Sequence, residues 1–97
     1  MPGKPYRLSP LAEQDLESIW LYTFERWSAG QADAYVRALV EAFEGLAAGA
    51  RYGHPVEVRK GYLKAFAGSH VVYYKDHAGH LDVIRVLHQR QDVSLHL

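Results

Sequence analysis

The chain has 97 residues, no cysteine and a formal net charge of zero, with 11 Lys or Arg side chains against 11 Asp or Glu. A chain of this length forms one core, so we expect a single domain over residues 1–97. The lack of cysteine excludes a disulfide framework and a thiolate metal site. No apolar run approaches the roughly 20 residues that a membrane span requires, so we expect a cytoplasmic protein without a membrane segment.

The first predicted elements are a short strand and a long helix. After a leading segment from Met1 to Pro5, residues 6–8 can form a brief strand at the edge of a sheet. Ser9 suits a helix N-cap and Pro10 suits the first helical position, where the missing N–H of proline removes no hydrogen bond. Apolar residues then recur at steps of three and four, which predicts an amphipathic helix over residues 10–26.

A second amphipathic helix is predicted over residues 29–48. It follows a break at Ser28-Ala29-Gly30 and ends near Gly49, which suits the position after a helix C-terminus. The break allows only a tight connection, so the helices should lie antiparallel and turn their apolar stripes to a common partner. The aromatic side chains of both helices are expected in the core: Trp20, Tyr22, Phe24, Trp27, Tyr35 and Phe43.

The remaining chain is predicted to be a loop followed by three strands. Residues 50–61 contain Gly and Pro among charged residues and show no period, which is typical of a loop. Residues 62–67, 70–75 and 81–88 are rich in β-branched and aromatic residues and are joined by short turns, so they should pair as consecutive antiparallel strands. The predicted fold class is α+β, with an N-terminal helical hairpin packed on a small antiparallel β-sheet.

The last strand, residues 81–88, should be central, because neither of its faces is purely polar. Simple alternation gives two faces, one with Leu81, Val83, Arg85 and Leu87 and the other with Asp82, Ile84, Val86 and His88.

The sequence shows no motif for a cofactor, a metal or a nucleophile. It has no Gly-rich phosphate loop, and its six histidines do not follow a known metal-binding spacing. Because His77 and His80 fall in a predicted turn and the others are scattered, we expect no metal site and no cofactor. Ser69 and His70 are neighbours on a strand and point to opposite faces, which excludes a nucleophile and base pair.

One cluster of polar residues has two interpretations, and it comprises Lys64, Arg85, His88 and Arg90. A metal-independent ribonuclease needs a base for the 2′-hydroxyl, a cation for the developing charge and an acid for the leaving oxygen. These residue types at the end of a sheet can supply all three. Alternatively, Arg85 pairs with a carboxylate beside the sheet, while His88 and Arg90 form a protein-binding edge.

Several segments, in their order and spacing, are similar to a known family: Y-R-L-S-P-L-A-E-Q-D-L-E-S-I-W from Tyr6, G-H-P from Gly53, G-S-H-V-V-Y-Y from Gly68 and V-I-R-V-L-H-Q-R-Q-D from Val83. Together they resemble the ParE toxins of the RelE/ParE superfamily over nearly the whole chain. The resemblance implies the α+β toxin fold of type II toxin–antitoxin systems, a ParD-like antitoxin as partner and DNA gyrase as target. Contact with operator DNA would then occur only through the antitoxin.

The resemblance also points to binding surfaces. The helical hairpin and the neighbouring edge strand should bind the antitoxin, with four residues lining or supporting that surface: Trp20, Phe24, Trp27 and Leu39. The polar residues best placed to contact the target, where the last strand leaves the core, are Arg85, His88, Arg90 and Asp92.

The alternative within the superfamily is a ribosome-dependent messenger ribonuclease of the RelE type. Toxins resembling RelE are strongly basic and carry cations on the sheet, whereas this chain is neutral and has Val71, Val72 and Tyr73 there. We therefore predict a toxin that acts by binding and has no catalytic residues. His88 and Arg90 keep the nuclease as the alternative.

Overall fold

The computed structural model describes residues 3–97, so the first two residues of the leading segment lie outside the described part. The elements, in chain order, are β1 (Tyr6–Leu8), α1 (Pro10–Arg26), α2 (Ala29–Ala48), β2 (His54–Pro55), β3 (Leu63–Ala67), β4 (His70–Asp76), β5 (Leu81–His88) and the 3-10 turn η1 (Val93–Leu95). Both predicted helices and all four predicted strands are confirmed, while β2 and η1 were not predicted. Within residues 3–97, no helix has the length and apolar content needed to cross a membrane.

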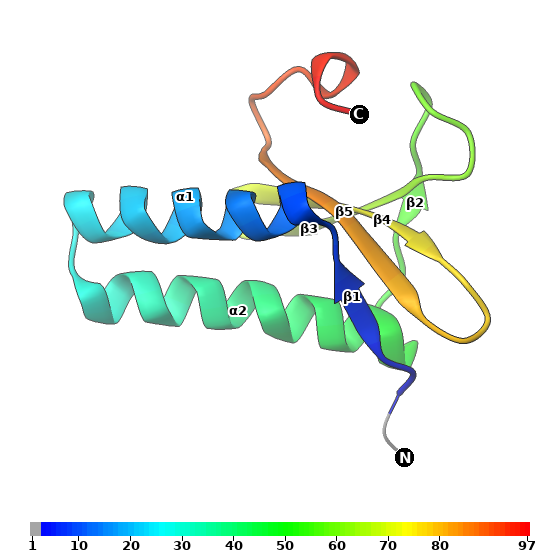
Figure 1. The fold of residues 1–97 in the computed structure, drawn as a ribbon, viewed down its shortest axis with the longest axis horizontal. Helices are drawn as coiled ribbons and strands as arrows, with labels where there is room; N and C mark the ends of the chain where they lie inside the picture. Colours follow the sequence, from blue (N-terminus) through cyan, green and yellow to red (C-terminus); the bar gives the residue numbers. More distant parts are fainter. Residues whose placement is uncertain (1–2) are drawn as a thin grey trace.

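The five strands form one sheet in the order β1-β5-β4-β3-β2. Strands β3, β4 and β5 pair antiparallel, as predicted, and β2 pairs antiparallel with β3 inside the segment predicted to be a loop. Strand β1 runs parallel to β5, so the sheet is mixed. Both helices cover one face of the sheet and lie antiparallel, and the end that carries the α1–α2 turn projects beyond the strands (Figure 1). The chain after β5 lies on the other side of the sheet.

The main core lies between the helices and the sheet. Leu39 and Phe43 of α2 are fully buried against Leu81 and Val83 of β5. The ring of Tyr6, at the edge of the sheet, meets Phe43 edge to face with centroids 5.5 Å apart. Burying a Leu or Phe side chain contributes about 1.5–3 kcal/mol, so these contacts fix α2 on the sheet.

A smaller core lies on the opposite face of the sheet. It consists of Val56, Val71, Tyr73 and Leu87, with Tyr62, Val93 and Leu97 packed around them. The 3-10 turn η1 brings Val93 and Leu97 over this face, because Asp92 caps the turn and accepts a 3.0 Å bond from the Ser94 N–H. The sheet is therefore covered on both sides, as predicted for its central strand.

A β-bulge in β5 makes the predicted assignment of its faces wrong. Tyr73 pairs with Arg85 and Tyr74 pairs with Val83, so Ile84 has no partner across the ladder. An extra residue in one strand reverses the alternation beyond it. Val83 consequently faces the helices, whereas Arg85 shares the opposite face with Tyr73, its partner across the ladder.

The free edge of β5 is closed by three successive groups. The β1 strand pairs with β5 as far as Val83, and the Ser9 N–H then donates to the Val83 carbonyl at 2.9 Å. The Ser9 hydroxyl donates to the Ile84 carbonyl at 2.6 Å and accepts the Ala12 N–H at 3.0 Å, so one side chain both caps α1 and anchors the bulge.

Asp15 of α1 closes the next position along the edge. Its carboxylate accepts the Val86 N–H at 2.9 Å and binds the Arg85 guanidinium through two bonds of 2.8 and 2.9 Å. Both side chains are only 14% exposed. These bonds outweigh desolvation and raise the pKa of Arg85, so its guanidinium stays charged.

We expect Asp15→Asn to lower the free energy of unfolding by about 3 kcal/mol, because it leaves the Arg85 guanidinium sheltered without a counter-charge. Urea unfolding followed by circular dichroism measures the change. Asp76→Asn is the matched control, since Asp76 is 47% exposed and pairs with Lys4, and an exposed pair contributes less than about 1 kcal/mol. An equal decrease in the free energy of unfolding for the two variants would show that the Asp15 contact does not stabilise the edge of β5.

Candidate functional site

A groove of about 960 Å³ lies at the projecting end of the helical hairpin. Ile19 and Tyr22 of α1 line one wall together with Trp27, the residue that follows α1, and Tyr35 of α2 lines the other. His70 and His88, at the start of β4 and the end of β5, are the strand residues that reach it. The helical walls therefore combine apolar and aromatic side chains with polar ones, Arg26 and Gln31 among them, and two histidines lie where the groove meets the sheet.

A chain of hydrogen bonds holds the polar end of the groove. The Ser69 N–H donates to the Tyr35 hydroxyl at 3.0 Å, and that hydroxyl lies 2.6 Å from Nδ1 of His70. Gly68 permits this approach, because it has φ of 59° and a Cβ there would lie 2.8 Å from the Tyr35 oxygen. The turn before β4 and the first half of α2 are thus tied together.

His70 and His88 face each other across the β4–β5 ladder. They are paired residues, and their rings meet edge to face with centroids 5.3 Å apart. Burial, and then the neighbouring His88, lower the pKa of His70 below the ordinary value of 6.5, although Asp15 acts in the opposite direction. A neutral His70 accepts the Tyr35 O–H at Nδ1, which is consistent with this direction.

The prediction that the helix aromatics are core residues holds for Phe43 but is wrong for the end of α1. Trp27 is 70% exposed and Tyr22 is 60% exposed, and Phe24 is also exposed. The reason is that the second half of α1 extends past the sheet, where no strand is available to cover it (Figure 1). The apolar residues at helical spacing in the second half of α1 therefore form an exposed surface and not part of the core.

The four residues predicted to form the antitoxin surface lie in three different environments. Trp27 lines the groove, and Leu39 is buried in the main core. Trp20 and Phe24 stack on each other with centroids 5.2 Å apart, and the Trp20 indole N–H donates to Asp33 at 2.8 Å. The structure thus gives one groove residue, one supporting core residue and a separate aromatic pair.

The four residues predicted to contact the target are also separated. Arg85 is bound to Asp15 and donates to the His96 carbonyl at 3.3 Å, so its charge is already paired. His88 lines the groove, while Arg90 and Asp92 are exposed in the segment that follows β5. Hydrogen bonds from Ser94 hold the pKa of the Asp92 carboxyl below its usual range.

The residues considered for ribonuclease chemistry do not form a common pocket. Lys64 lies on β3 and Tyr73 of β4 separates it from Arg85 in the sheet. Among residues 3–97, the one hydrogen bond that joins two of the four candidates runs from the Arg90 N–H to His88 Nδ1, at 3.1 Å. The alternative interpretation, in which Arg85 pairs with a carboxylate beside the sheet, matches the Asp15 contact.

Comparison with known proteins places the chain in a family. A family model described as "ParE toxin of type II toxin-antitoxin system, parDE" matches residues 6–93. The chain belongs to the ParE toxin family. It is 47% identical over 94 residues to Toxin ParE1 of Mycobacterium tuberculosis, covering 95% of this chain and 96% of that protein. This ParE-family chain is therefore a toxin of a type II toxin–antitoxin system.

Solved structures agree with this assignment at the level of the fold. A chain in the chromosomal ParDE TA system from P. aeruginosa has a TM-score of 0.77 at 17% identity, over 88% of this chain and 95% of that one. A chain in the toxin–antitoxin complex RelBE2 from M. tuberculosis has a TM-score of 0.67 at 22% identity, over 90% of this chain and 99% of that one. The predicted α+β fold of the RelE/ParE type is thereby confirmed.

Sequence reasoning missed Tyr22, Tyr35 and His70 as groove residues. A signal for His70 was present, since strands 70–75 and 81–88 were predicted to pair and place His70 near His88. The Tyr35 contact had no such signal, because it depends on how far α2 extends over the turn at Gly68.

We expect the stability of this ParE-family toxin to fall as the pH drops below about 6.5, because the unfolded chain then binds a proton that folded His70 resists. His70→Gln should reduce this pH dependence, since glutamine stays neutral. Urea unfolding at several pH values between about 5 and 8 measures how the free energy of unfolding of the wild type and of the variant depends on pH. The control is His54→Gln, an exposed histidine outside the groove; an equal effect of the two variants would contradict the assignment to His70.

Proposed function

We propose that a ParD-like antitoxin neutralises this toxin by laying an amphipathic segment into the groove of the helical hairpin. The observation that carries the proposal is the groove itself, about 960 Å³ in volume and lined by exposed aromatic side chains such as Trp27 and Tyr22. Small proteins rarely leave such apolar surface uncovered, and a helix that fills a groove is a common way to cover it.

The surface that we propose is a revision of the four predicted residues. Trp27 contacts the antitoxin directly, because it combines a large apolar area with exposure in the groove. Trp20 and Phe24 extend the contact on the adjacent face of α1, and Leu39 supports it from the core. Trp and Tyr at the centre of an interface commonly carry much of the binding energy.

The proposed target is DNA gyrase, and the proposed mode of action is binding without catalysis. Gyrase is what the resemblance to ParE toxins implies, and the chain belongs to that family. Binding without catalysis is supported by the paired state of Arg85, which leaves this guanidinium unable to hold an RNA phosphate. His88, Arg90 and Asp92 are the remaining candidates for target contact, at the end of β5. In this scheme the toxin works in the cytoplasm and meets operator DNA only through the antitoxin.

The second candidate function is a ribosome-dependent messenger ribonuclease. The feature that favours it is the pair His70 and His88, which lie side by side at the polar end of the groove next to the Tyr35 hydroxyl. Two imidazoles and a phenol can act as acid and base. Arg85 does not supply the cation, since it is bound to Asp15, and the cation that lines the groove is Arg26 at the end of α1, which lies over the Tyr22 ring.

We expect Trp27→Ala to weaken antitoxin binding by about 2 kcal/mol or more, which is close to thirtyfold in Kd. Calorimetric titration of the toxin with its antitoxin measures this change. Tyr52→Ala is the control, because Tyr52 is an exposed aromatic residue that lies outside the groove. Loss of affinity in the Tyr52 variant, with Trp27→Ala unchanged, would place the antitoxin on another surface.

Induction of the toxin without its antitoxin should trigger a DNA-damage response before protein synthesis falls, because a trapped gyrase leaves cleaved DNA. Reporter strains for DNA damage and pulse labelling of new protein measure the order of events.

Arg90→Glu should reduce toxicity and leave antitoxin binding intact. Deletion of the whole tail would not test this point, because Val93 and Leu97 cover the second core. Early translation arrest with cut messages, lost on His88→Ala, would establish the ribonuclease instead.

A further inference from the structure

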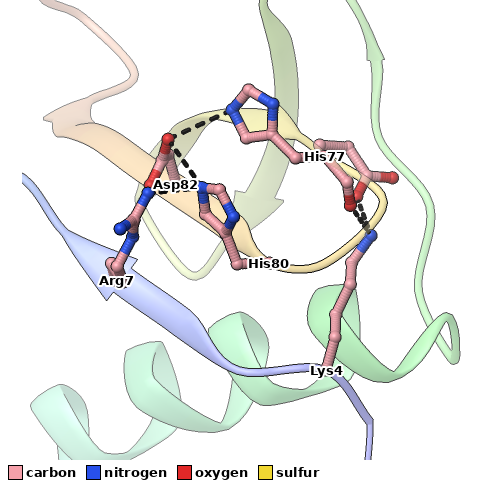
Figure 2. A network of polar contacts seen from close by, with 6 residues as sticks. Lys4, Arg7, His77, His80 and Asp82 are labelled. Carbon is pink, nitrogen blue, oxygen red and sulfur yellow. Dashed lines mark hydrogen bonds and ion pairs between the residues drawn. The ribbon is translucent and has the colours of Figure 1, made fainter.

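Three side chains with metal-ligand atoms gather at the β4–β5 turn, at the opposite end of β5 from the groove. Figure 2 shows His77 and His80 both directed at the Asp82 carboxylate, with Arg7 on its other side. The Nε2 atoms of His77 and His80 lie 3.1 and 3.2 Å from Asp82 Oδ2, and one ligand atom from each residue lies within 4.8 Å of the others. No metal site was predicted here, because His77 and His80 fall in a turn, yet this turn is what brings the two side chains together.

Hydrogen bonds and strand pairing hold these three residues in place. The His77 N–H donates to the His80 carbonyl at 3.0 Å, which closes the turn, and Lys4 donates to the His77 carbonyl. Asp82 is fixed in the sheet between its partners on β4 and β1. The two imidazole rings stack with centroids 4.5 Å apart and an interplanar angle of 26°.

The polar contacts of His80 are in conflict with one another. Its Nε2 lies against Asp82 Oδ2, which needs a donor, and also against Nη2 of Arg7, which needs an acceptor. A neutral imidazole nitrogen is either a donor or an acceptor, so Nε2 cannot satisfy both neighbours. A cation placed among the two Nε2 atoms and Oδ2 would accept all three lone pairs at once.

We infer that His77, His80 and Asp82 form a binding site for a divalent transition-metal cation of the zinc type. Zinc ligands at about 2.0–2.2 Å in tetrahedral geometry lie about 3.3 Å from one another, close to the two nitrogen–oxygen distances in this cluster. Two imidazoles and one carboxylate suit zinc, cobalt or nickel, whereas Mg²⁺ and Ca²⁺ prefer all-oxygen sites. Three protein ligands leave a coordination position open to water or to a side chain of a bound partner.

Arg7 is the competitor for this site. Its side chain is 66% exposed, and its Nε lies 3.2 Å from Asp82 Oδ1, so the guanidinium supplies the positive charge that a metal ion would otherwise supply. An exposed Arg side chain moves into water at little cost. Metal binding therefore requires only that Arg7 turn away, and a variant that lacks the guanidinium should bind the metal more tightly.

The test uses the untagged full-length chain, titrated with Zn²⁺ and with Mg²⁺ by calorimetry, and the Co²⁺ complex examined by visible absorption. We expect one Zn²⁺ per chain with micromolar or better affinity, no binding of Mg²⁺, and a Co²⁺ spectrum of a low-coordinate nitrogen and oxygen site. Zn²⁺ should also raise Tm, because it binds the folded turn.

Variants then separate this site from chance binding to surface histidines. His80→Gln should weaken Zn²⁺ binding by about tenfold or more, whereas His54→Gln, at an exposed histidine elsewhere, should leave it unchanged. Arg7→Gln keeps all three ligands and should strengthen binding, which separates loss of a ligand from loss of the fold. Absence of Zn²⁺ binding in the wild type, or equal binding by the wild type and His80→Gln, would overturn the inference.

Discussion

The edge of β5 is the constraint on which the rest of the molecule depends. On the side of β5 away from β4, the backbone N–H and C=O groups would be unpaired without a neighbour. Here β1, Ser9 and Asp15 pair with them one after another along the strand. The Ser9 hydroxyl has two roles, because it caps α1 and also donates to the carbonyl of the bulged Ile84. The direction in which α1 leaves the sheet is thus fixed by the hydrogen bonds of the strand beside it.

That direction divides the helical hairpin into two parts with different roles. The first half of α1 and the second half of α2 pack on the sheet and supply Ala12, Leu39 and Phe43 to the main core. The other halves extend past the strands and hold the groove between them, with Trp27 and Tyr22 exposed. Stability therefore resides where the helices meet β5. The groove, which we propose as the partner surface, can stay apolar because its exposed side chains contribute little to the main core.

The sequence predicted those features that depend on local signals. Ser9 and Pro10 marked the start of α1, Gly49 marked the end of α2 with φ of 78°, and the turns at Gly68 and His77 marked the strands. The features it did not predict depend on contacts between distant segments. The bulge at Ile84 is anchored by Ser9, 75 positions away in the chain, and it decides which face Arg85 occupies. The exposure of Trp27 likewise depends on where the sheet ends, and the spacing of apolar residues along the helix does not show this.

The uncovered half of the helical hairpin is the surface on which we propose that an antitoxin binds. Hydrogen exchange of the toxin, alone and with its antitoxin bound, tests this proposal most directly, because it reports protection segment by segment. The account predicts slower exchange in residues 18–38 and at Ser69 and His70, with residues 77–82 unchanged. Protection confined to β2 and β3, the other edge of the sheet, with the helices unaffected, would contradict it.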